Sequence, residues 1–282
     1  MSISKVAVIG AGTMGNGIAQ ACAGAGFSVV MVDINDEAVG RGLKTISGSL
    51  DRLIKKEKIT EAQKNQLLAN IKGTTNYADI AQVDLVIEAA TENLPIKLRI
   101  FKQIEETVSA EAIIATNTSS ISITQMAATL SKPSRFMGLH FFNPVPVMAL
   151  VELICGLQTS GETLADMKAF AVAVGKTPIT VKNRPGFVVN RILCPMINEA
   201  INVLDEGIAT AEEIDTGMKL GCSHPIGPLA LADLIGLDTM LSVMEVFHEG
   251  FGDPRYAPAP MLKEMVAAGY LGRKSGRGFY QY

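Results

Sequence analysis

The stretch VAVIGAGTMG, Val6 to Gly15, decides the fold of the N-terminal part of this chain. Its first four residues are apolar, which is typical of a buried strand. Three glycines then follow in the pattern G-x-G-x-x-G, at Gly10, Gly12 and Gly15, and a helical pattern begins directly after them. A strand, a glycine turn and a helix in this order form an anion-binding turn of a doubly wound α/β domain, in which the helix N-terminus faces the anion.

An acidic residue completes a dinucleotide-binding fingerprint. Asp33 ends the second predicted strand, SVVMVD, close to the spacing of about 20 residues that the fingerprint requires. Its carboxylate can accept both hydrogen bonds of an adenosine ribose diol and would repel a 2′-phosphate. Ile34 and Asn35 supply no compensating cation, so the pattern predicts NAD rather than NADP. The alternative is a structural glycine turn with an aspartate that caps a helix.

Strand and helix patterns alternate along the first two thirds of the chain, which predicts an α/β fold with a parallel-rich sheet. After Pro185 only helical periodicity remains. We therefore expect a Rossmann-type NAD-binding domain with a helical-hairpin insertion at residues 1–184, and an all-α domain at residues 185–282. The predicted strands are Val6–Ile9, Ser28–Asp33, Asp84–Ala90, Ala112–Asn117, Arg135–Phe142, Ala149–Ile154 and Thr177–Val181.

The composition is that of an ordinary globular protein, with 48% hydrophobic and 19% charged residues and a net charge of −3 over 282 residues. No basic excess points to nucleic acid as a partner. The apolar stretch Gly138–Leu157 contains a histidine, an asparagine, a glutamate and two prolines. These residues argue against a membrane span, and the first residues lack the charged-then-apolar pattern of a signal peptide.

The cysteines indicate a reducing compartment. Cys22, Cys155, Cys194 and Cys222 form no C-x-x-C pair, and each lies in an apolar stretch. We expect buried free thiols and a cytoplasmic location. No cluster of histidine, cysteine and aspartate has the spacing of a metal site.

A second informative stretch is LHFFNPVPVMALVEL, Leu139 to Leu153, which is almost wholly apolar but contains His140 and Glu152. The segment NPVP favours a turn, so the strands on either side should run side by side. A lone buried carboxylate costs several kcal/mol and needs a partner, and His140 is the nearest candidate. A histidine backed by a carboxylate is a general base for an alcohol. In the alternative, Glu152 is solvated on an edge strand and His140 is a core residue.

Two further polar residues are candidates for a site. Ser119 follows a predicted strand, in a loop that also contains Asn117, at the carboxyl edge where α/β folds bind ligands. It could instead cap the next helix, a role equally open to Ser122. Asn190 is an unusual amide early in an apolar helix, and a polar contact between domains would also explain it. Pro195 lies in the same helix and should kink it.

Seven motifs occur together in this chain: VAVIGAGTMGNGIAQ, IEAATEN, TNTSS, GLHFFNPVPVMALVEL, PGFVVNRIL, HPIGPLALADLIGLD and GRKSGRGFYQY. Over essentially the whole chain they resemble the 3-hydroxyacyl-CoA dehydrogenase family, and within it the short, stand-alone bacterial type. The resemblance implies an NAD-dependent enzyme that interconverts (3S)-3-hydroxyacyl-CoA and 3-oxoacyl-CoA. Its small-molecule partner would be an acyl-CoA.

The resemblance also implies roles for single residues. His140 is similar to the family's catalytic base, and Glu152 to its carboxylate partner. Ser119 matches the hydroxyl that contacts the substrate's 3-oxygen, and Asn190 the amide that holds the substrate from the helical domain. The fingerprint and the resemblance together imply these cofactor-binding positions: Gly10, Gly12, Thr13, Met14, Gly15, Asp33, Ala90, Glu92, Lys97, Asn117, Asn143 and Lys274.

The segment Arg41–Lys72 has helical periodicity and carries basic side chains. Arg52 and Lys56 lie four residues apart and therefore on one face of a helix. They are similar to positions that contact coenzyme A in the family. A solvated charged face is the alternative.

The helical part contains more apolar surface than a domain of its size needs, which favours a homodimer. Residues 185–282 are thus expected to bind substrate and to dimerise.

Three other functions stay open. A β-hydroxyacid dehydrogenase acting without CoA would more usually contain a catalytic lysine, and a UDP-sugar dehydrogenase would need an activated cysteine. A catalytically silent, structural or NAD-sensing member of the family would keep the fold without the activity.

Overall fold

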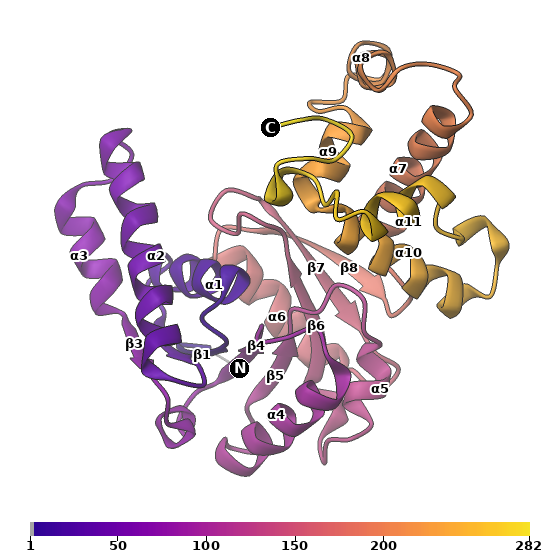
Figure 1. The fold of residues 1–282 in the computed structure, drawn as a ribbon. Helices are drawn as coiled ribbons and strands as arrows, with labels where there is room; N and C mark the ends of the chain where they lie inside the picture. Colours follow the sequence, from indigo (N-terminus) through magenta and orange to yellow (C-terminus); the bar gives the residue numbers. More distant parts are fainter. Residues whose placement is uncertain (1–2) are drawn as a thin grey trace. The chain divides into compact units, whose positions relative to one another are not determined.

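The computed structural model describes residues 3–282 and consists of two compact units, residues 1–184 and 185–282. The first unit is an α/β domain and the second is helical (Figure 1). Among the described residues, no helix is long and apolar enough to cross a membrane.

An eight-stranded sheet forms the centre of the first unit, in the order β3-β2-β1-β4-β5-β6-β7-β8. Neighbouring strands are parallel, except that β6 and β7 are antiparallel. Parallel strands covered on both faces are mostly apolar, and every residue of β4 and β5 is buried, with a polar residue only at the last position of each. The strands are β1 Lys5–Ile9, β2 Ser28–Val32, β3 Ile71–Thr74, β4 Leu85–Glu88, β5 Ile113–Thr116, β6 Phe136–Phe141, β7 Leu150–Cys155 and β8 Thr177–Lys182.

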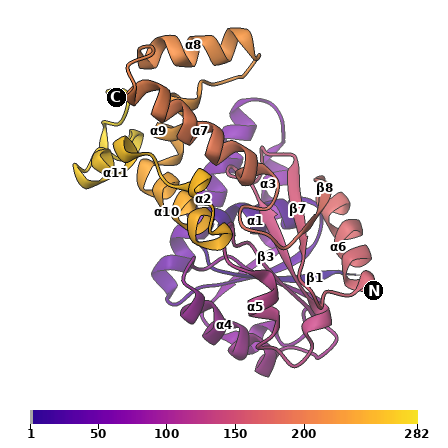
Figure 2. The ribbon, with the colours of Figure 1, turned by 90° about the vertical axis from the view of Figure 1, so that its right-hand side faces the viewer.

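Helices cover both faces of this sheet, α1 and α6 on one and α4 and α5 on the other (Figures 1 and 2). The order of the strands reverses between β1 and β4, and folds of this kind bind ligands at the carboxyl ends of the strands beside such a reversal. The helices are α1 Thr13–Gly24, α2 Asp36–Lys55, α3 Glu61–Ala69, α4 Leu94–Thr107, α5 Ile123–Ala127 and α6 Gly161–Ala173, with short 3₁₀ turns at Tyr77–Ile80 and Pro133–Arg135.

The predicted α/β fold class is confirmed, and each predicted strand is present to within two residues at either end. One prediction was wrong, because the segment Arg41–Lys72 is not helical to its end. Helices α2 and α3 are separated by Glu57, whose φ is +55°, and the chain then forms the edge strand β3 at Ile71–Thr74. The sequence IKGT is too short and too polar to predict a strand, and pairing with β2 decides its conformation.

The second unit is a cluster of helices around an apolar core that includes Ile201, Leu237 and Phe247. Its described residues form no β-strand and only two isolated β-bridges, Gly272 with Arg277 and Arg277 with Gln281. Pro195 lies inside α7, and the predicted kink there stays a prediction. The helices are α7 Val189–Asp205, α8 Ala211–Gly221, α9 Pro228–Ile235, α10 Leu237–Phe251 and α11 Pro260–Ala267, with 3₁₀ turns at Pro254–Tyr256 and Arg273–Ser275.

Two buried aspartates fasten the C-terminal residues to these helices. Asp215 on α8 accepts hydrogen bonds from two amides in the first turn of α9 and from the Tyr280 hydroxyl. Asp233 on α9 accepts hydrogen bonds from the amides of Phe279 and Tyr280. A carboxylate is buried only where donors of this kind replace water, so these contacts hold the end of the chain against α8 and α9.

Candidate active site

The glycine turn between β1 and α1 has the geometry that close approach of an anion requires. Gly10 has a φ of +104°, a conformation that side chains rarely adopt. A Cβ on Gly15 would lie 1.8 Å from the Gly10 carbonyl oxygen, so α1 can pack here only with glycine. A Cβ on Gly12 would meet no described atom within 4 Å, and this face of the turn opens into a cavity of about 570 Å³.

Asp33 joins the glycine turn to this cavity. Its Oδ2 accepts a hydrogen bond from the Ala11 amide at 2.6 Å, and its Oδ1 accepts one from the Ile34 amide at 2.7 Å. Asp33 also lines the cavity. The alternative of a helix cap is wrong, because Asn35 caps α2 by accepting a hydrogen bond from the Ala38 amide. These features fit a dinucleotide whose diphosphate lies against Gly12 and whose ribose meets Asp33.

The cavity continues along one face of α2. Arg41, Thr45, Ser49 and Arg52 recur at helical spacing and line it together with Asp33. Arg41, which was not predicted from the sequence, adds a cation to this wall and pairs with Glu37. Of the two predicted CoA residues, Arg52 lines this cavity, whereas Lys56 follows the end of α2 and is not among its lining residues.

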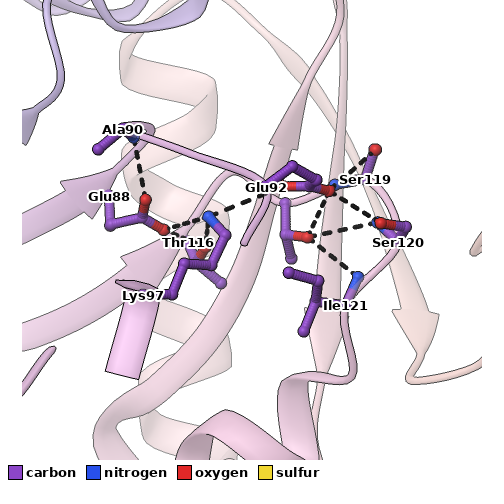
Figure 3. A network of polar contacts seen from close by, with 9 residues as sticks. Glu88, Ala90, Glu92, Lys97, Thr116, Ser119, Ser120 and Ile121 are labelled. Atoms are coloured by element: carbon purple, nitrogen blue, oxygen red, sulfur yellow. Dashed lines mark hydrogen bonds and ion pairs between the residues drawn. The ribbon is translucent and has the colours of Figure 1, made fainter. Parts of the chain in front are cut away.

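A buried ion pair lies behind the carboxyl ends of β4 and β5 (Figure 3). Lys97 is buried, and its Nζ lies 2.5 Å from Oε2 of the equally buried Glu88. The Thr116 hydroxyl donates to the same oxygen at 2.7 Å, and Glu88 Oε1 accepts from the Ala90 amide at 2.9 Å. Ala90 in turn lies against Gly10, where a Cβ would come within 2.8 Å of the Ala90 Cα. The Glu88–Lys97 ion pair therefore supports the glycine turn through Ala90.

A second carboxylate organises the loop that contains Ser119. Glu92 Oε1 accepts hydrogen bonds from the Ser119 amide at 2.8 Å, the Ser119 hydroxyl at 3.1 Å and the Ser120 hydroxyl at 3.0 Å (Figure 3). Glu92 Oε2 lies 3.8 Å from Lys97 Nζ, so the two networks meet. Ser122 caps α5, so Ser119 is not needed for that role. Asn117 accepts a hydrogen bond from the Phe141 amide and thereby joins this loop to the end of β6.

Glu88 and Ser120 belong to these networks and were not predicted from the sequence. The available signal for Glu88 was a glutamate at the end of the apolar strand LVIE, which needs a buried partner in the same way as Glu152. The buried lysine Lys97 likewise needs a partner that neutralises it, and Glu88 is that partner.

His140 and Glu152 face one another across β6 and β7, where they form a register pair. His140 Nδ1 lies 2.7 Å from Glu152 Oε2, and the side chains of His140 and Glu152 are 8% and 0% exposed. Strand β7 pairs with β6 and β8, so the alternative of a solvated glutamate on an edge strand is wrong. With Nδ1 donating to the carboxylate, the nitrogen of the neutral ring that accepts a proton is Nε2.

The turn that joins these two strands forms another wall of the cavity. Its residues Asn143, Pro144, Val145 and Pro146 line the cavity together with residues of α1 and α2. The predicted cofactor residue Asn143 is thus in the same cavity as Gly12, Thr13 and Asp33. Met14 and Gly15 lie in the first turn of α1, where Gly15 is buried and Met14 packs against the core.

Two predicted residues lie in the second unit. Asn190 is the second residue of α7 and is partly buried. Lys274 lies in the 3₁₀ turn Arg273–Ser275 and forms an ion pair with Asp238 at the start of α10.

The buried cysteines are not activated nucleophiles. Burial raises the pKa of the Cys22 thiol to about 12 and that of the Cys194 thiol to about 12, so both stay protonated at neutral pH. Burial also raises the pKa of Cys155. The prediction that all four thiols are buried was wrong: Cys155 is only partly buried, and Cys222, which follows α8, is exposed. An apolar neighbourhood in the sequence does not bury a residue at the end of a surface helix.

Comparison with known proteins identifies the family. The model of the NAD binding domain of 3-hydroxyacyl-CoA dehydrogenase matches residues 5–184, and the model of that enzyme's C-terminal domain matches residues 186–282. A probable 3-hydroxybutyryl-CoA dehydrogenase of Bacillus subtilis is 51% identical over 282 residues, which cover 100% of this chain and 98% of the relative. A 3-hydroxybutyryl-CoA dehydrogenase of Clostridioides difficile is 47% identical over 99% of both chains.

A solved structure agrees with these relatives. The (S)-3-hydroxybutyryl-CoA dehydrogenase from Ralstonia eutropha, whose crystal structure is known, is 67% identical in sequence to this chain. The two structures superpose with a TM-score of 0.98, over 100% of this chain and 99% of that chain. The two family models account for nearly the whole chain, and the relatives match from end to end. The chain therefore belongs to the 3-hydroxyacyl-CoA dehydrogenase family.

Proposed function

We propose that this protein interconverts (3S)-3-hydroxyacyl-CoA and 3-oxoacyl-CoA with NAD as the cofactor, and that 3-hydroxybutyryl-CoA and acetoacetyl-CoA are its substrates. The observation that carries the proposal is the buried contact of 2.7 Å between His140 and Glu152. It lies in a unit that also contains a complete dinucleotide-binding turn. The short acyl chain is supported by the relatives that match over their full length, which are 3-hydroxybutyryl-CoA dehydrogenases by name.

In the oxidation, His140 Nε2 takes the proton from the 3-hydroxyl of the substrate. Glu152 holds the ring by Nδ1 and stabilises the imidazolium that forms. Bound NAD supplies the acceptor for the hydride that leaves C3. Ser119, held by Glu92, positions the 3-oxygen, and Asn190 holds the acyl group. In the reduction, protonated His140 donates the proton to the 3-oxo oxygen.

The cofactor is held by the glycine turn and by residues at the carboxyl ends of β4 and β5. Gly10, Gly12 and Gly15 admit the diphosphate, with Thr13 and Met14 in the first turn of α1. Asp33 binds the adenosine ribose. We assign the nicotinamide half to Ala90, Glu92, Asn117, Asn143 and Lys274, with the buried Lys97 acting on it through Glu92, whose Oε2 lies 3.8 Å from its Nζ.

Replacing Asp33 with alanine should raise the KM for NADH by about tenfold or more, because a hydrogen bond to a charged group contributes about 1.5–3 kcal/mol. Use of NADPH should improve relative to NADH, since the charge that repels its 2′-phosphate is gone and Arg41 lines the same cavity. Steady-state kinetics with both cofactors measure this change. Asp36→Ala, on the exposed start of α2, is the control. A wild-type protein that already prefers NADPH would contradict the assignment.

Coenzyme A carries phosphates, and we assign them to two basic residues, Arg52 on α2 and Lys56 directly after its end. Arg52→Ala with Lys56→Ala should raise the KM for acetoacetyl-CoA by about 5–10-fold, since each exposed ion pair contributes up to about 1 kcal/mol. The KM for NADH should change less than about twofold. Arg99→Ala with Lys102→Ala removes the same charge from the exposed face of α4 and is the control. Because Arg52 shares the cavity of Asp33, an equal rise of both KM values would move Arg52 to the cofactor.

The second unit is assigned to substrate binding and to dimerisation. On α7 the side chain of Ile192 is 68% exposed, and Val188 and Leu234 are also exposed. Exposed large apolar side chains such as these are typical of a subunit interface. We assign the protein to the cytoplasm and expect it to be a homodimer. We propose neither a nucleic-acid partner nor a membrane partner.

Turnover of acetoacetyl-CoA with NADH, followed at the absorbance of NADH, tests the proposed function. Binding of NADH without turnover would favour the catalytically silent alternative. Turnover of a free 3-hydroxy acid at a rate equal to that of its CoA thioester would favour the β-hydroxyacid dehydrogenase without CoA.

A further inference from the structure

A lysine of the first unit is buried without any role in the chemistry described above. Lys176 precedes β8 and is only 8% exposed. Its Nζ donates hydrogen bonds to the carbonyl oxygens of Val145, at 2.5 Å, and Met148, at 2.8 Å. In the part of the chain that the structure describes, no carboxylate forms an ion pair with it. The partners of this lysine are therefore two backbone carbonyls of one turn.

The local fold aims Lys176 at this turn. Helix α6 ends at Ala173, and Gly175, with a φ of +76°, reverses the chain in a conformation that favours glycine. The Lys176 amide then donates to the Ala171 carbonyl, and the Thr177 amide donates to the Ala149 carbonyl at 2.7 Å. Two successive residues thus bind the segment between β6 and β7, one by its side chain and one by its backbone.

The segment Asn143–Met148, which we call the hairpin turn, has three functions in the first unit. It joins the strand of His140 to the strand of Glu152. Four of its residues form a wall of the cavity that contains Gly12 and Asp33. Its buried residue Val145 also packs on α1, where a Cβ on Gly17 would lie 3.0 Å from the Val145 Cβ. The position of the hairpin turn therefore sets the width of the cavity beside the glycine turn.

Holding this turn with a lysine is costly, because an ammonium loses its hydration on burial. Burial accordingly lowers the pKa of Lys176. A neutral amine still has two N–H donors, so both carbonyls can be satisfied in either protonation state. An apolar side chain would pack with less penalty but would leave the carbonyl oxygens of Val145 and Met148 without these donors, which is unfavourable above all for the buried Val145.

We propose that Lys176 is a positioning residue of the dinucleotide site, which holds the hairpin turn against α1 and so fixes the wall that carries Asn143. The nature of the ligand rests on the proposed function. The pairing of His140 with Glu152 depends on the register of β6 and β7 and not on Lys176. Loss of the lysine should therefore affect binding of the cofactor more than the chemical step.

Lys176→Met removes the donors and keeps the length of the side chain. We expect the Kd for NADH, measured by isothermal titration, to rise by about tenfold or more, while kcat at saturating NADH stays within about threefold of wild type. Hydrogen exchange of the Val147 and Met148 amides, which both donate to the Pro144 carbonyl, should become faster. Lys182→Met makes the same substitution at an exposed position of β8 and should leave all three quantities unchanged.

A folded Lys176→Met protein with wild-type affinity for NADH and unchanged exchange in the hairpin turn overturns the proposal, because the lysine would then serve stability alone. If this variant does not fold, Lys176→Gln replaces it. The glutamine amide still donates hydrogen bonds, but its side chain is shorter and cannot reach both the Val145 and the Met148 carbonyl oxygens. Its affinity for NADH should be lower than that of the wild type, and an unchanged affinity again overturns the proposal. Failure of the wild-type protein and of Lys182→Met to bind NADH would refute the proposed function instead.

Discussion

Replacing His140 with glutamine should lower kcat for acetoacetyl-CoA by at least about 10²-fold, the scale of general acid–base catalysis. His140 is the proposed base of the site; it is buried, and its Nδ1 contacts Glu152. Glutamine keeps a hydrogen-bonding group of similar size but does not exchange a proton at neutral pH. The measurement is steady-state kinetics at saturating NADH, with the Kd for NADH as a test that the cofactor site is intact.

His248→Gln is the matched control, because it makes the same substitution at an exposed position of α10. Its kcat should equal that of the wild type. If His140→Gln retained more than a tenth of the wild-type kcat while binding NADH normally, another group would have to move the proton.

Replacing Glu152 with glutamine should also lower kcat, by about tenfold or more, with little change in the affinity for NADH. The substitution keeps the shape but removes the negative charge that opposes the imidazolium in a site where Glu152 is wholly buried. The double variant His140→Gln, Glu152→Gln should lose little more than His140→Gln alone, because a base and the group that orients it act as one unit.

A double-mutant cycle in kcat measures this coupling, and Glu106→Gln, on an exposed face of α4, controls for the chemical change. Two losses that simply multiply would show that Glu152 acts independently of His140. A folded Glu152→Gln protein with wild-type kcat would make Glu152 a structural residue.

The sequence alone was sufficient where partners are near one another along the chain or follow a fixed spacing. The turn from Gly10 to Gly15 is local, and its geometry follows from glycine conformation and the helix N-terminus. The contact of His140 with Glu152 could be predicted because a short turn sets two antiparallel strands side by side and because a buried carboxylate needs a partner. The alternation of strands and helices likewise predicted the α/β class.

Only the tertiary structure decided the remaining contacts, whose partners are distant in the sequence and have no distinctive pattern. Edge strand β3 exists because β2 offers free hydrogen-bonding groups to the polar segment IKGT. Arg41 and Arg52 of α2 line the same cavity as Asp33. Their place there depends on how α2 packs beside α1. Glu88 is the partner of Lys97, and Lys176 holds two carbonyls about thirty residues earlier in the chain. A buried charge reveals in the sequence that it needs a partner, but packing alone determines which groups come within hydrogen-bonding distance.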